Sequence, residues 1–514
     1  MAVAPGWLRY GWAALAGAAL SFAFAPFGVW PLAILCPAYL MWSWQGSTVR
    51  EAAALGFWFG AGTFGAGTWW LYISIHTNGG APIWLALLLM LGLVIIMAAY
   101  YALLGALGAQ LLPAVGPWRT LAGLPALWLL FEWWRGWFLS GFPWLSLGYA
   151  YTDAWLGGYA PLLGVYGVSA VSLWQSGALV AASRCRGGPR AALLGGCALL
   201  WLAGLGLGRV PWTHPHGAPI PVAILQGAIP QDEKWQLDNL EPTKQRYRSL
   251  NEQATGARLI IWPESAIPQF ANEIPHYLAA IQDSARQRGA DVLMGVVRIS
   301  DNGTQYYNSI LALTAGVAFY DKRHLVPYSE YLPVPRFVRR WLRLMNLPSE
   351  DFTAGGDYQA PLQAASLRLA PTICYEDGFG SAQLPLVRAA DALVNVTNDA
   401  WFGHSPARFQ HLQIARMRAL ETGRYLLRAA NDGVSAIIGP RGELLGEAPG
   451  YRQALLRGTV VPMAGLPPYL GTGNWPVLLL AVLAAAGAGG RRRSRPVRGV
   501  ESIHGIIPGP ATGP

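Results

Sequence analysis

The sequence predicts a multi-pass α-helical membrane domain of about eight spans that carries an α/β domain outside the cytoplasm. Of the 514 residues, 53% are hydrophobic and only 12% are charged, a balance typical of a membrane protein. Apolar segments long enough to cross a bilayer crowd the chain before residue 210. Between about residues 215 and 465, short β-rich runs alternate instead with helical stretches. These observations together predict two regions with different environments.

Eight apolar segments are predicted to be transmembrane helices, because each approaches the roughly 20 apolar residues that a spanning helix needs. They are 10–26, 30–46, 54–75, 83–112, 119–139, 159–183, 191–209 and 474–489. The eighth is short for a full span. The first could instead be a cleaved signal peptide, since Ala23-Phe24-Ala25 resembles a cleavage site. Pro26 follows directly and further spans come after it, so we expect a retained helix.

The basic residues near the ends of these spans predict the orientation of the chain. If the spans alternate, a set of these residues falls on one side, which the positive-inside rule assigns to the cytoplasm. They are Arg9, Arg50, Arg119, Arg184, Arg186, Arg190 and the run from Arg491 to Arg493. The opposite loops, 76–82 and 140–158, contain no Lys or Arg. Both termini are therefore expected in the cytoplasm, and the long segment after the seventh span is expected outside it.

Four regions follow from this topology. They are a membrane domain of seven transmembrane helices at 1–214, an extracytoplasmic α/β domain at 215–465, a C-terminal transmembrane helix at 466–490, and a basic, disordered cytoplasmic tail at 491–514. Within the α/β domain, strands are expected at 221–227, 258–264, 292–297, 306–314, 317–322, 367–376 and 392–398, and helices at 275–289 and 407–423. The second region has the size of an enzyme domain.

Charge and cysteine content exclude several classes of function. The net charge of +10 does not indicate a nucleic-acid-binding protein, because the basic residues are scattered and no stripe of aromatic residues lies among them. The four cysteines, Cys36, Cys185, Cys197 and Cys374, lack C-x-x-C spacing. Three of them fall in or beside apolar segments, so neither a disulfide framework nor a zinc site is expected. We expect no metal and no cofactor, and Cys374 remains to be explained.

Three polar residues each follow a β-rich run: Glu264 after "LIIWP", Lys322 after "AFYD", and Cys374 after "LAPTI". Because the ends of neighbouring strands meet at one edge of a sheet, we expect these residues to converge there. A carboxylate that removes a thiol proton, a thiolate that attacks a carbonyl, and an ammonium that stabilises the oxyanion form a complete set for acyl transfer. Each also has an ordinary interpretation: Cys374 as a buried small hydrophobe, and Glu264 as a solvated acid.

The identity of the basic residue is informative. The chain has only three lysines, Lys234, Lys244 and Lys322, against 34 arginines, so it uses arginine for a generic positive charge. A lysine within "YDKRHLVPYSEYLP" therefore indicates a need for a compact ammonium in place of a guanidinium fork. The other two lysines have no evident role in the sequence.

Four blocks, "WPES", "YDKRHLVPYSEYLP", "ICYED" and "NDAWFG", resemble the nitrilase, or carbon-nitrogen hydrolase, superfamily. Joined to the apolar half and to "FEWWRGWFLSGFPWLSLGYAY" at 131–151, they resemble the apolipoprotein N-acyltransferase family over about residues 5 to 490. The resemblance implies an α-β-β-α sandwich and a Glu-Lys-Cys triad. In it, Glu264 is the general base, Lys322 stabilises the oxyanion, and Cys374 is the nucleophile.

The resemblance also implies substrates and a location. An acyl chain passes from a phospholipid, through a Cys374 thioester, to the α-amino group of the diacylglyceryl-cysteine that begins a bacterial apolipoprotein. The enzyme lies in the bacterial inner membrane, with its catalytic domain on the periplasmic side. Supporting or substrate-binding roles are expected for Glu330, Glu376, Tyr375, Trp235, Trp401 and Phe402. Glu376 would share the side of the nucleophile if the strand continued through it.

Two other functions remain open from the residues. A membrane-anchored amidase of the nitrilase type would use the same triad but pass the acyl group to water. A non-catalytic scaffold or transporter is the other alternative, although the paired helix-breaking motifs of many transporters are not seen. Eight spans around a single outer domain favour a lipid donor over a soluble amide. Within the membrane half, Glu132 and Arg135 lie three residues apart and are expected to pair on one helix face.

Overall fold

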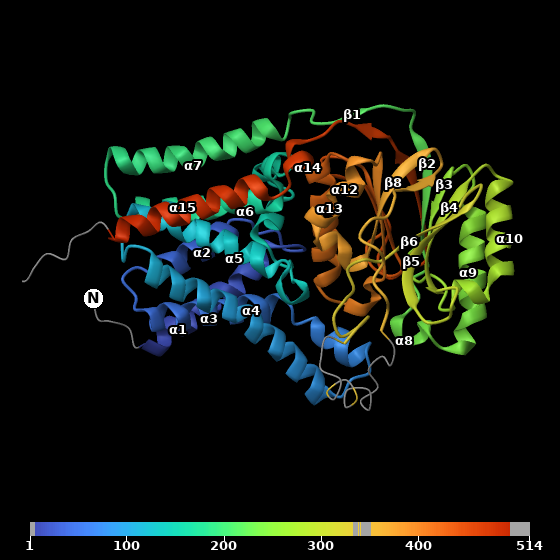
Figure 1. Ribbon diagram of the computed structural model, residues 1–514, viewed down its shortest axis with the longest axis horizontal. Helices are drawn as coiled ribbons and strands as arrows, with labels where there is room; N and C mark the ends of the chain where they lie inside the picture. Colours follow the sequence, from blue (N-terminus) through green and yellow to red (C-terminus); the bar gives the residue numbers. More distant parts are fainter. Residues whose placement is uncertain (1–5, 333–337, 339, 341–350, 494–514) are drawn as a thin grey trace, which may run out of the picture.

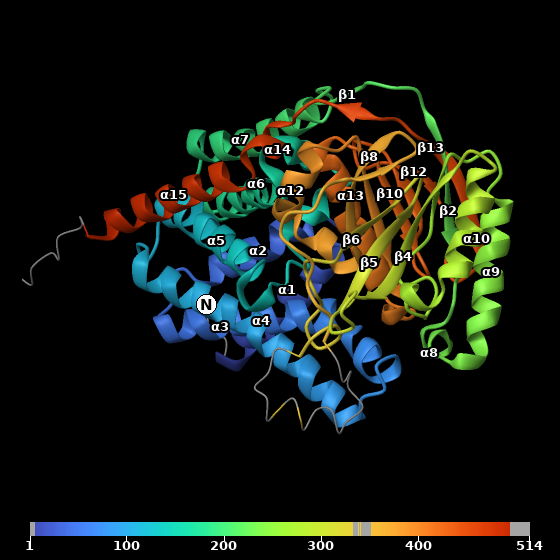
Figure 2. The ribbon, with the colours of Figure 1, turned by 45° about the vertical axis from the view of Figure 1, so that its right-hand side comes forward.

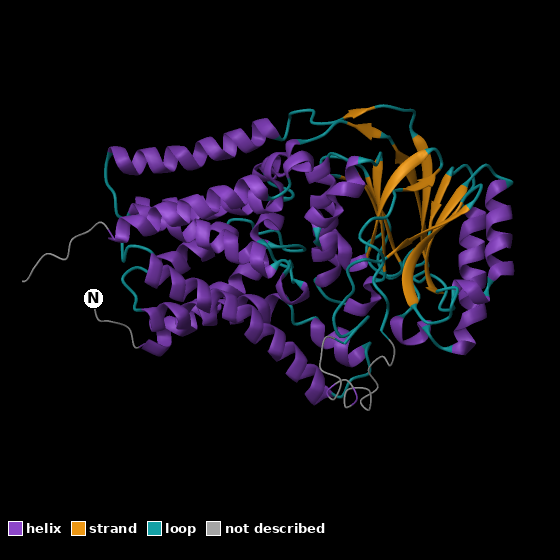
Figure 3. Cartoon of the chain, viewed as in Figure 1, coloured by secondary structure: helices purple, strands orange, loops and turns teal. Residues whose placement is uncertain are grey.

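The structure is a computed structural model in which residues 6–332, 338, 340 and 351–493 are described. An α-helical bundle and a two-sheet domain lie side by side, and the chain passes from the first to the second and back (Figure 1). Helices form one half of the molecule, and the β-strands are confined to the other (Figure 3). Most of the tail predicted to be disordered, 494–514, lies outside the described residues.

Each predicted span overlaps a helix of the bundle. These helices are α1 (Gly6–Leu20), α2 (Leu32–Ser43), α3 (Val49–Gly67), α4 (Ile83–Leu111), α5 (Leu124–Arg135), α6 (Ala160–Ala182), α7 (Gly188–Leu207) and α15 (Trp475–Arg493). Among the described residues, three helical segments are long and apolar enough to cross a membrane: Ile83–Leu111, Trp155–Ala182 and Gly188–Leu207. Two shorter helices, α2 and Trp475–Arg491 of α15, are also apolar.

The bundle is held together where small residues let helix backbones approach. A Cβ atom added at Gly62 of α3 would lie 2.0 Å from the carbonyl oxygen of Ala14, and one added at Gly56 would lie 2.1 Å from that of Tyr101. Close backbone contact increases van der Waals packing, which is important where lipid supplies no hydrophobic driving force. Glycine at these positions therefore sets how closely α3 packs against α1 and α4.

The strands form two six-stranded sheets that pack face to face. The outer sheet has the order β13-β2-β3-β4-β5-β6 and the inner sheet, nearer the bundle, has the order β12-β11-β10-β9-β8-β7. The outer strands are β2 (Ile220–Gln226), β3 (Leu259–Ile261), β4 (Asp291–Ile299), β5 (Tyr306–Leu313), β6 (Val317–Asp321) and β13 (Ala454–Val460). The inner strands are β7 (Leu362–Ala364), β8 (Leu367–Ile373), β9 (Ala392–Thr397), β10 (Leu426–Ala430), β11 (Ala436–Ile438) and β12 (Leu444–Glu447).

Helices cover both outer faces of this pair of sheets. Helices α9 (Leu240–Gln253) and α10 (Pro275–Arg286) lie on the outer sheet, far from the bundle, in both views (Figures 1 and 2). Helices α12 (Gly380–Arg388) and α13 (Ala407–Thr422) lie between the inner sheet and the bundle (Figure 1). Apolar side chains from both sheets fill the space between them. The result is the α-β-β-α sandwich that the family resemblance implies.

All seven predicted strands and both predicted helices of this domain overlap observed elements. Strand β10 escaped prediction because Arg428 interrupts its short apolar run, although that arginine is buried. The chain enters and leaves the domain through two short segments, β1 (His214–Pro215) and β14 (Met463–Ala464), that pair antiparallel. This two-stranded connection joins α7 and α15 to the domain.

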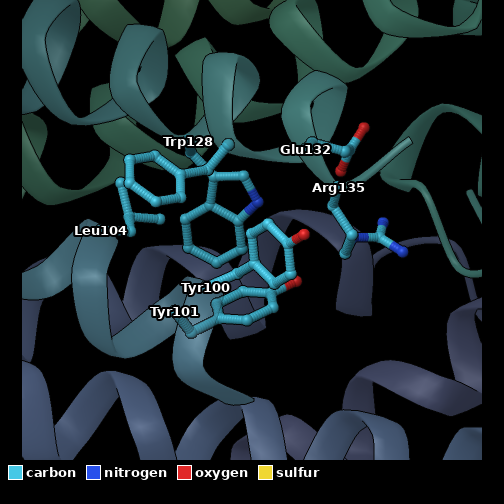
Figure 4. Close-up of a pocket in the computed structure, with 7 residues that line it drawn as sticks. Tyr100, Tyr101, Leu104, Trp128, Glu132 and Arg135 are labelled. Atoms are coloured by element: carbon cyan, nitrogen blue, oxygen red, sulfur yellow. The ribbon is translucent and has the colours of Figure 1, made fainter. Parts of the chain in front are cut away.

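Glu132 and Arg135 share one side of α5, and the Arg135 charge acts on Glu132, but no direct ion pair joins them in the part of the chain that the structure describes. Glu132 accepts hydrogen bonds from Ser169 Oγ at 2.5 Å and from Leu147 N at 3.1 Å, and Arg135 donates to the carbonyl oxygen of Trp144 at 2.7 Å. Both residues line a cavity of about 10 Å³ together with Tyr100, Tyr101, Leu104, Trp128 and Phe131 (Figure 4). Through these hydrogen bonds, each residue holds main-chain groups of the 140–158 loop, which would otherwise be buried without a hydrogen-bond partner.

Candidate active site

Glu264 lies in a tight turn directly after β3. The next residue, Ser265, has φ +45, and a Cβ atom on Gly295 of β4 would lie 2.5 Å from the Glu264 Cα. Only glycine at 295 lets the turn pack this closely. The Glu264 carboxylate is 8% exposed and accepts a hydrogen bond from Asn308 Nδ2 at 2.7 Å. The base candidate is therefore fixed by both its backbone and its side chain.

Lys322 is the first residue after β6, and its ammonium lies between two carboxylates. Its Nζ is 2.9 Å from the Glu330 carboxylate and 3.7 Å from Glu264 Oε1. Burial lowers the pKa of Lys322, but the charges of Glu330 and Glu264 outweigh burial and raise the pKa well above its usual value. The ammonium is therefore charged at any physiological pH, as an oxyanion stabiliser must be.

Asn308, in the middle of β5, holds the two carboxylates in place and was missed in the sequence. Its Nδ2 donates to Glu264 at 2.7 Å and to Glu330 at 2.9 Å. Its main-chain carbonyl oxygen accepts a hydrogen bond from the main-chain N–H of Lys322 at 2.8 Å. Val326 N donates to the other oxygen of Glu330 at 2.8 Å. The signal that could have found Asn308 is an amide side chain inside the apolar run "YYNSILALT", where a buried polar group needs partners.

Cys374 lies at a sharp bend between β8 and a short 3₁₀ helix, Cys374–Gly378. Its φ is +51, a left-handed conformation that non-glycine residues rarely adopt and that stores strain at functional sites. Burial and the charge of Glu264 raise the pKa of the thiol well above its usual value, and Lys322 opposes them. The resting thiol is therefore protonated, and a base must take its proton as it attacks.

The three residues meet, but not from neighbouring strands of one sheet, and that part of the prediction is wrong. Glu264 and Lys322 follow β3 and β6 of the outer sheet, which β4 and β5 separate, whereas Cys374 follows β8 of the inner sheet. They converge because the two sheets pack face to face and these strands end at the same edge. The charges of Glu264 and Lys322 both act on the Cys374 thiol.

Glu376 does not share the side of the nucleophile, because β8 ends at Ile373 and the chain turns. Its side chain is fully buried and accepts hydrogen bonds from the backbone N–H groups of Ile373 at 2.8 Å, Arg323 at 2.7 Å and His324 at 3.1 Å. Burial raises the pKa of Glu376, and these hydrogen bonds oppose the shift. This carboxyl group joins the bend at Cys374 to the loop that follows Lys322.

Tyr375 connects the site to the helical bundle. Its hydroxyl donates to the carbonyl oxygen of Gly141 at 2.9 Å, and His324 Nε2 donates to that of Ser140 at 2.8 Å. Burial lowers the pKa of His324 to about 4, so its imidazole is neutral and can donate in this way. Leu139, Ser140 and Gly141 all have positive φ. A strained segment of the bundle thus contacts loops on both sides of the triad.

The remaining predicted residues lie at the edges of the site. The carbonyl oxygen of Trp401 accepts hydrogen bonds from Ser74 Oγ and Asn78 Nδ2, each at 2.9 Å. The ring of Phe402 packs on Trp70, with centroids 4.8 Å apart. These contacts join the "NDAWFG" block to the bundle. Trp235, by contrast, is 53% exposed and leaves its ring available to a substrate.

A buried charge network behind Cys374 was also missed. His411 Nδ1 lies 2.8 Å from Asp399 and its Nε2 lies 3.0 Å from Asp377, while Arg428 contacts Asp399 at 2.9 Å and Asp377 at 3.3 Å. Burial lowers the pKa of His411, but the aspartates outweigh burial and raise the pKa to about 9. With His411 protonated, two positive charges balance two negative ones. The network comes from four separate segments, so no local motif reveals it.

Comparison with known proteins gives matches to both halves of the chain. Residues 16–178 match the family described as the apolipoprotein N-acyltransferase N-terminal domain, and residues 221–461 match the carbon-nitrogen hydrolase family. The apolipoprotein N-acyltransferase of Methylococcus capsulatus is 44% identical over 468 residues, which cover 90% of this chain and 92% of the relative. That of Pseudomonas aeruginosa is 40% identical over 483 residues, with 93% and 94% covered.

Among solved structures, the C. elegans NitFhit protein is similar at 18% identity and a TM-score of 0.37, over 51% of this chain and 64% of that chain. The sequence matches are thus much closer than the structural one. The two families matched cover most of the helical bundle and nearly all of the two-sheet domain.

Proposed function

Because the chain belongs to the apolipoprotein N-acyltransferase family, we propose that Cys374 carries, as a thioester, the acyl group that this acyltransferase adds to lipoproteins. The observation that supports this role most directly is the arrangement of charges at the thiol. Glu264 Oε1 and Lys322 Nζ lie 3.7 Å apart, and the charges of both residues act on Cys374. A base and an oxyanion stabiliser are thus placed at one nucleophile.

In the first half-reaction the donor is a phospholipid ester. Glu264 takes the thiol proton as the Cys374 sulfur attacks the ester carbonyl, and Lys322 donates a hydrogen bond to the oxyanion that forms. The intermediate then collapses, the carbon–oxygen bond to the glycerol breaks, and Glu264 returns the proton to the leaving alkoxide. The products are a thioester on Cys374 and a lysophospholipid.

In the second half-reaction the same groups act on the lipoprotein. The neutral α-amino group of its diacylglyceryl-cysteine attacks the thioester, and Lys322 again stabilises the oxyanion. Glu264 takes a proton from the attacking nitrogen and gives it to the departing Cys374 sulfur. An amide bond forms, the thioester bond breaks, and the enzyme returns to its starting state.

A water-consuming amidase would use the same three residues, but the surroundings favour a lipid donor. The nucleophile's neighbour Tyr375 and the "NDAWFG" block both contact the helical bundle directly. The site therefore lies against the helical bundle, which we propose the membrane surrounds. A phospholipid in the bilayer would reach it without crossing water.

We further propose that all eight bundle helices cross the inner membrane, with the two-sheet domain in the periplasm and both termini in the cytoplasm. This gives the four regions 1–214, 215–465, 466–490 and 491–514. Each of the eight helices overlaps one of the eight apolar segments of the sequence. Supporting roles follow from the contacts: Glu330 positions Lys322, Glu376 positions the bend at Cys374, and the exposed Trp235 contacts substrate.

The acyl-enzyme can be tested by intact mass. The purified chain is incubated in detergent micelles with phospholipid and no acceptor. We expect one fatty-acyl increment that hydroxylamine removes at neutral pH, as a thioester requires. The increment should be absent in Cys374→Ala and present in the control Cys185→Ala. An adduct that persisted in Cys374→Ala would remove Cys374 from the mechanism.

The acceptor step separates transferase from amidase. A peptide that bears an N-terminal diacylglyceryl-cysteine should discharge the thioester faster than water does, with the acyl group recovered on its α-amino nitrogen. Discharge at the same rate with and without the peptide would favour the hydrolase alternative.

A further inference from the structure

Two of the three lysines in this arginine-rich chain are buried at the same glutamate. Lys322 and Lys234 are each 1% exposed, whereas Lys244 is partly exposed on α9, 3.0 Å from Glu241. Lys234 Nζ lies 3.2 Å from the main-chain carbonyl oxygen of Glu264, to which it donates a hydrogen bond. The mechanism described above uses Lys322 and leaves this second buried ammonium without a role.

Lys234 ends the short helix α8 (Gln231–Lys234), which contacts segments that follow strands of both sheets. At the other end of α8, Gln231 Oε1 accepts a hydrogen bond from Asn398 Nδ2 at 2.7 Å, on the side of the inner sheet. Lys234 reaches the turn that follows β3 of the outer sheet. The helix therefore joins the turn that carries Glu264 to the "NDAWFG" block, and the exposed Trp235 follows it directly.

The charge balance of the site gives Lys234 a second purpose. The carboxylates of Glu264 and Glu330 share the single ammonium of Lys322, and the Cys374 thiol is neutral at rest. Without another cation, these four side chains would together carry one uncompensated buried negative charge, which is costly away from water. The ammonium of Lys234 supplies the missing positive charge.

We propose that Lys234 is a positioning residue for the general base: its ammonium holds the backbone of Glu264 in the productive turn and supplies the positive charge that balances the Glu264 carboxylate. The proposal rests on the proposed role of Glu264. Loss of Lys234 would leave Glu264 facing Glu330 across one lysine, so its carboxylate would hold a proton to higher pH. A protonated Glu264 cannot accept the thiol proton of Cys374.

The ionisation of Lys234 itself fits this role. Burial lowers the pKa of Lys234, and the charge of Glu264 opposes the shift, which leaves the pKa at about 8. The charged group of another segment that acts on it is Glu264, after β3. On its own segment, Asp232 and Glu233 are exposed to solvent. At pH 7 the ammonium form of Lys234 predominates, and its charge is available to Glu264.

The test is the pH dependence of thioester formation by the full-length chain with phospholipid micelles in single turnover. Lys234→Met removes the charge and the hydrogen bond, and Lys234→Gln removes the charge but keeps a donor. We expect both variants to form the thioester about tenfold more slowly than wild type at pH values on the acid limb of the profile. We expect their acid limb to move up by roughly one pH unit, the scale of an opposite charge nearby.

Raising the pH should restore part of the lost rate, because Glu264 then ionises without help. Lys244→Met, which removes the surface lysine, should keep the rate and the acid limb of wild type. An acid limb that stayed in place in Lys234→Gln would overturn the electrostatic role, even if the rate fell. A wild-type chain that formed no thioester would instead contradict the proposed function, so the two failures are distinct.

Discussion

At the scale of single residues, the ammonium of Lys322 stands between the Glu264 and Glu330 carboxylates in a space that is closed to solvent. A guanidinium has the same charge but is planar and broader, and its donors form a fixed fork. It cannot occupy the position of a single Nζ atom that contacts both carboxylates and an oxyanion in turn.

We therefore expect Lys322→Arg to lower turnover by about 10²–10³, the cost of losing one oxyanion donor in other enzymes. The measurement is the single-turnover rate of thioester formation, with melting temperature as a check on folding. The matched change Lys244→Arg, at the surface of α9, should be neutral. Activity of Lys322→Arg within about threefold of wild type would make Lys322 a structural charge only.

Asn308 offers a second test at this scale, because its amide is the neutral donor shared by two carboxylates. Asn308→Asp replaces that donor with a third carboxylate of the same size, which repels both. We expect at least a tenfold loss of turnover, an acid limb shifted to higher pH, and a lower melting temperature.

The control for this change is Asn302→Asp in an exposed loop. Asn302 Oδ1 accepts hydrogen bonds from Ser300 Oγ and Thr304 N, and an aspartate can accept the same bonds. Asn302→Asp should therefore leave the turnover rate and the melting temperature unchanged. Equal effects of the two substitutions would show that Asn308 does not organise the carboxylates.

At the scale of elements, the His411 network ties the bend at Cys374 to three other segments. His411 lies on α13, Arg428 on β10, Asp377 in the 3₁₀ turn after Cys374, and Asp399 after β9. His411 Nε2 also lies 3.2 Å from the carbonyl oxygen of Cys374. The left-handed conformation of Cys374 is thus held from behind by a group whose charge depends on pH.

This network predicts a pH dependence of stability. The aspartates raise the pKa of His411 from its usual value near 6.5 to about 9 in the folded chain. A raised histidine pKa contributes stability that is fully present below about pH 6.5 and is lost as the pH rises through about 9. We expect the melting temperature in detergent to fall over this interval. His411→Gln should have a lower melting temperature below the interval and a flatter profile across it.

The exposed His276, on α10, provides the control, because His276→Gln should leave the profile as in wild type. The same fall in His411→Gln as in wild type would assign the pH dependence to other groups.

These elements also show what the sequence could and could not reveal. Apolar runs with turn signals marked every bundle helix and seven strands, and the positions directly after three strands marked the triad. The sequence did not show that Cys374 comes from a different sheet, because strand order is set by long-range pairing. Asn308, Lys234 and His411 were also hidden, since the contacts of each include one with a residue 30 or more positions distant along the chain.

At the scale of the whole molecule, the connection between the two halves bears on the proposed topology. The segments that follow α7 and precede α15 pair as β1 and β14, so both helices meet the two-sheet domain at the same end of the bundle (Figure 1). The opposite ends of α7 and α15 carry Arg190 and Arg491, beside the loop with Arg184 and Arg186. These four arginines thus lie at the end of the bundle far from the triad.

The positive-inside rule favours a cytoplasmic position for that basic end, which supports the proposed placement of the two-sheet domain outside. We expect reporter fusions after Arg190 and after Arg493 to give a cytoplasmic signal, and a fusion in the exposed loop at Asn302 to give a periplasmic one. The loop fusion is decisive, because apolipoproteins and their diacylglyceryl anchors are expected on the outer side. A cytoplasmic signal from Asn302 would contradict the proposed topology, and it would also place Cys374 on the wrong face of the membrane for its acceptor.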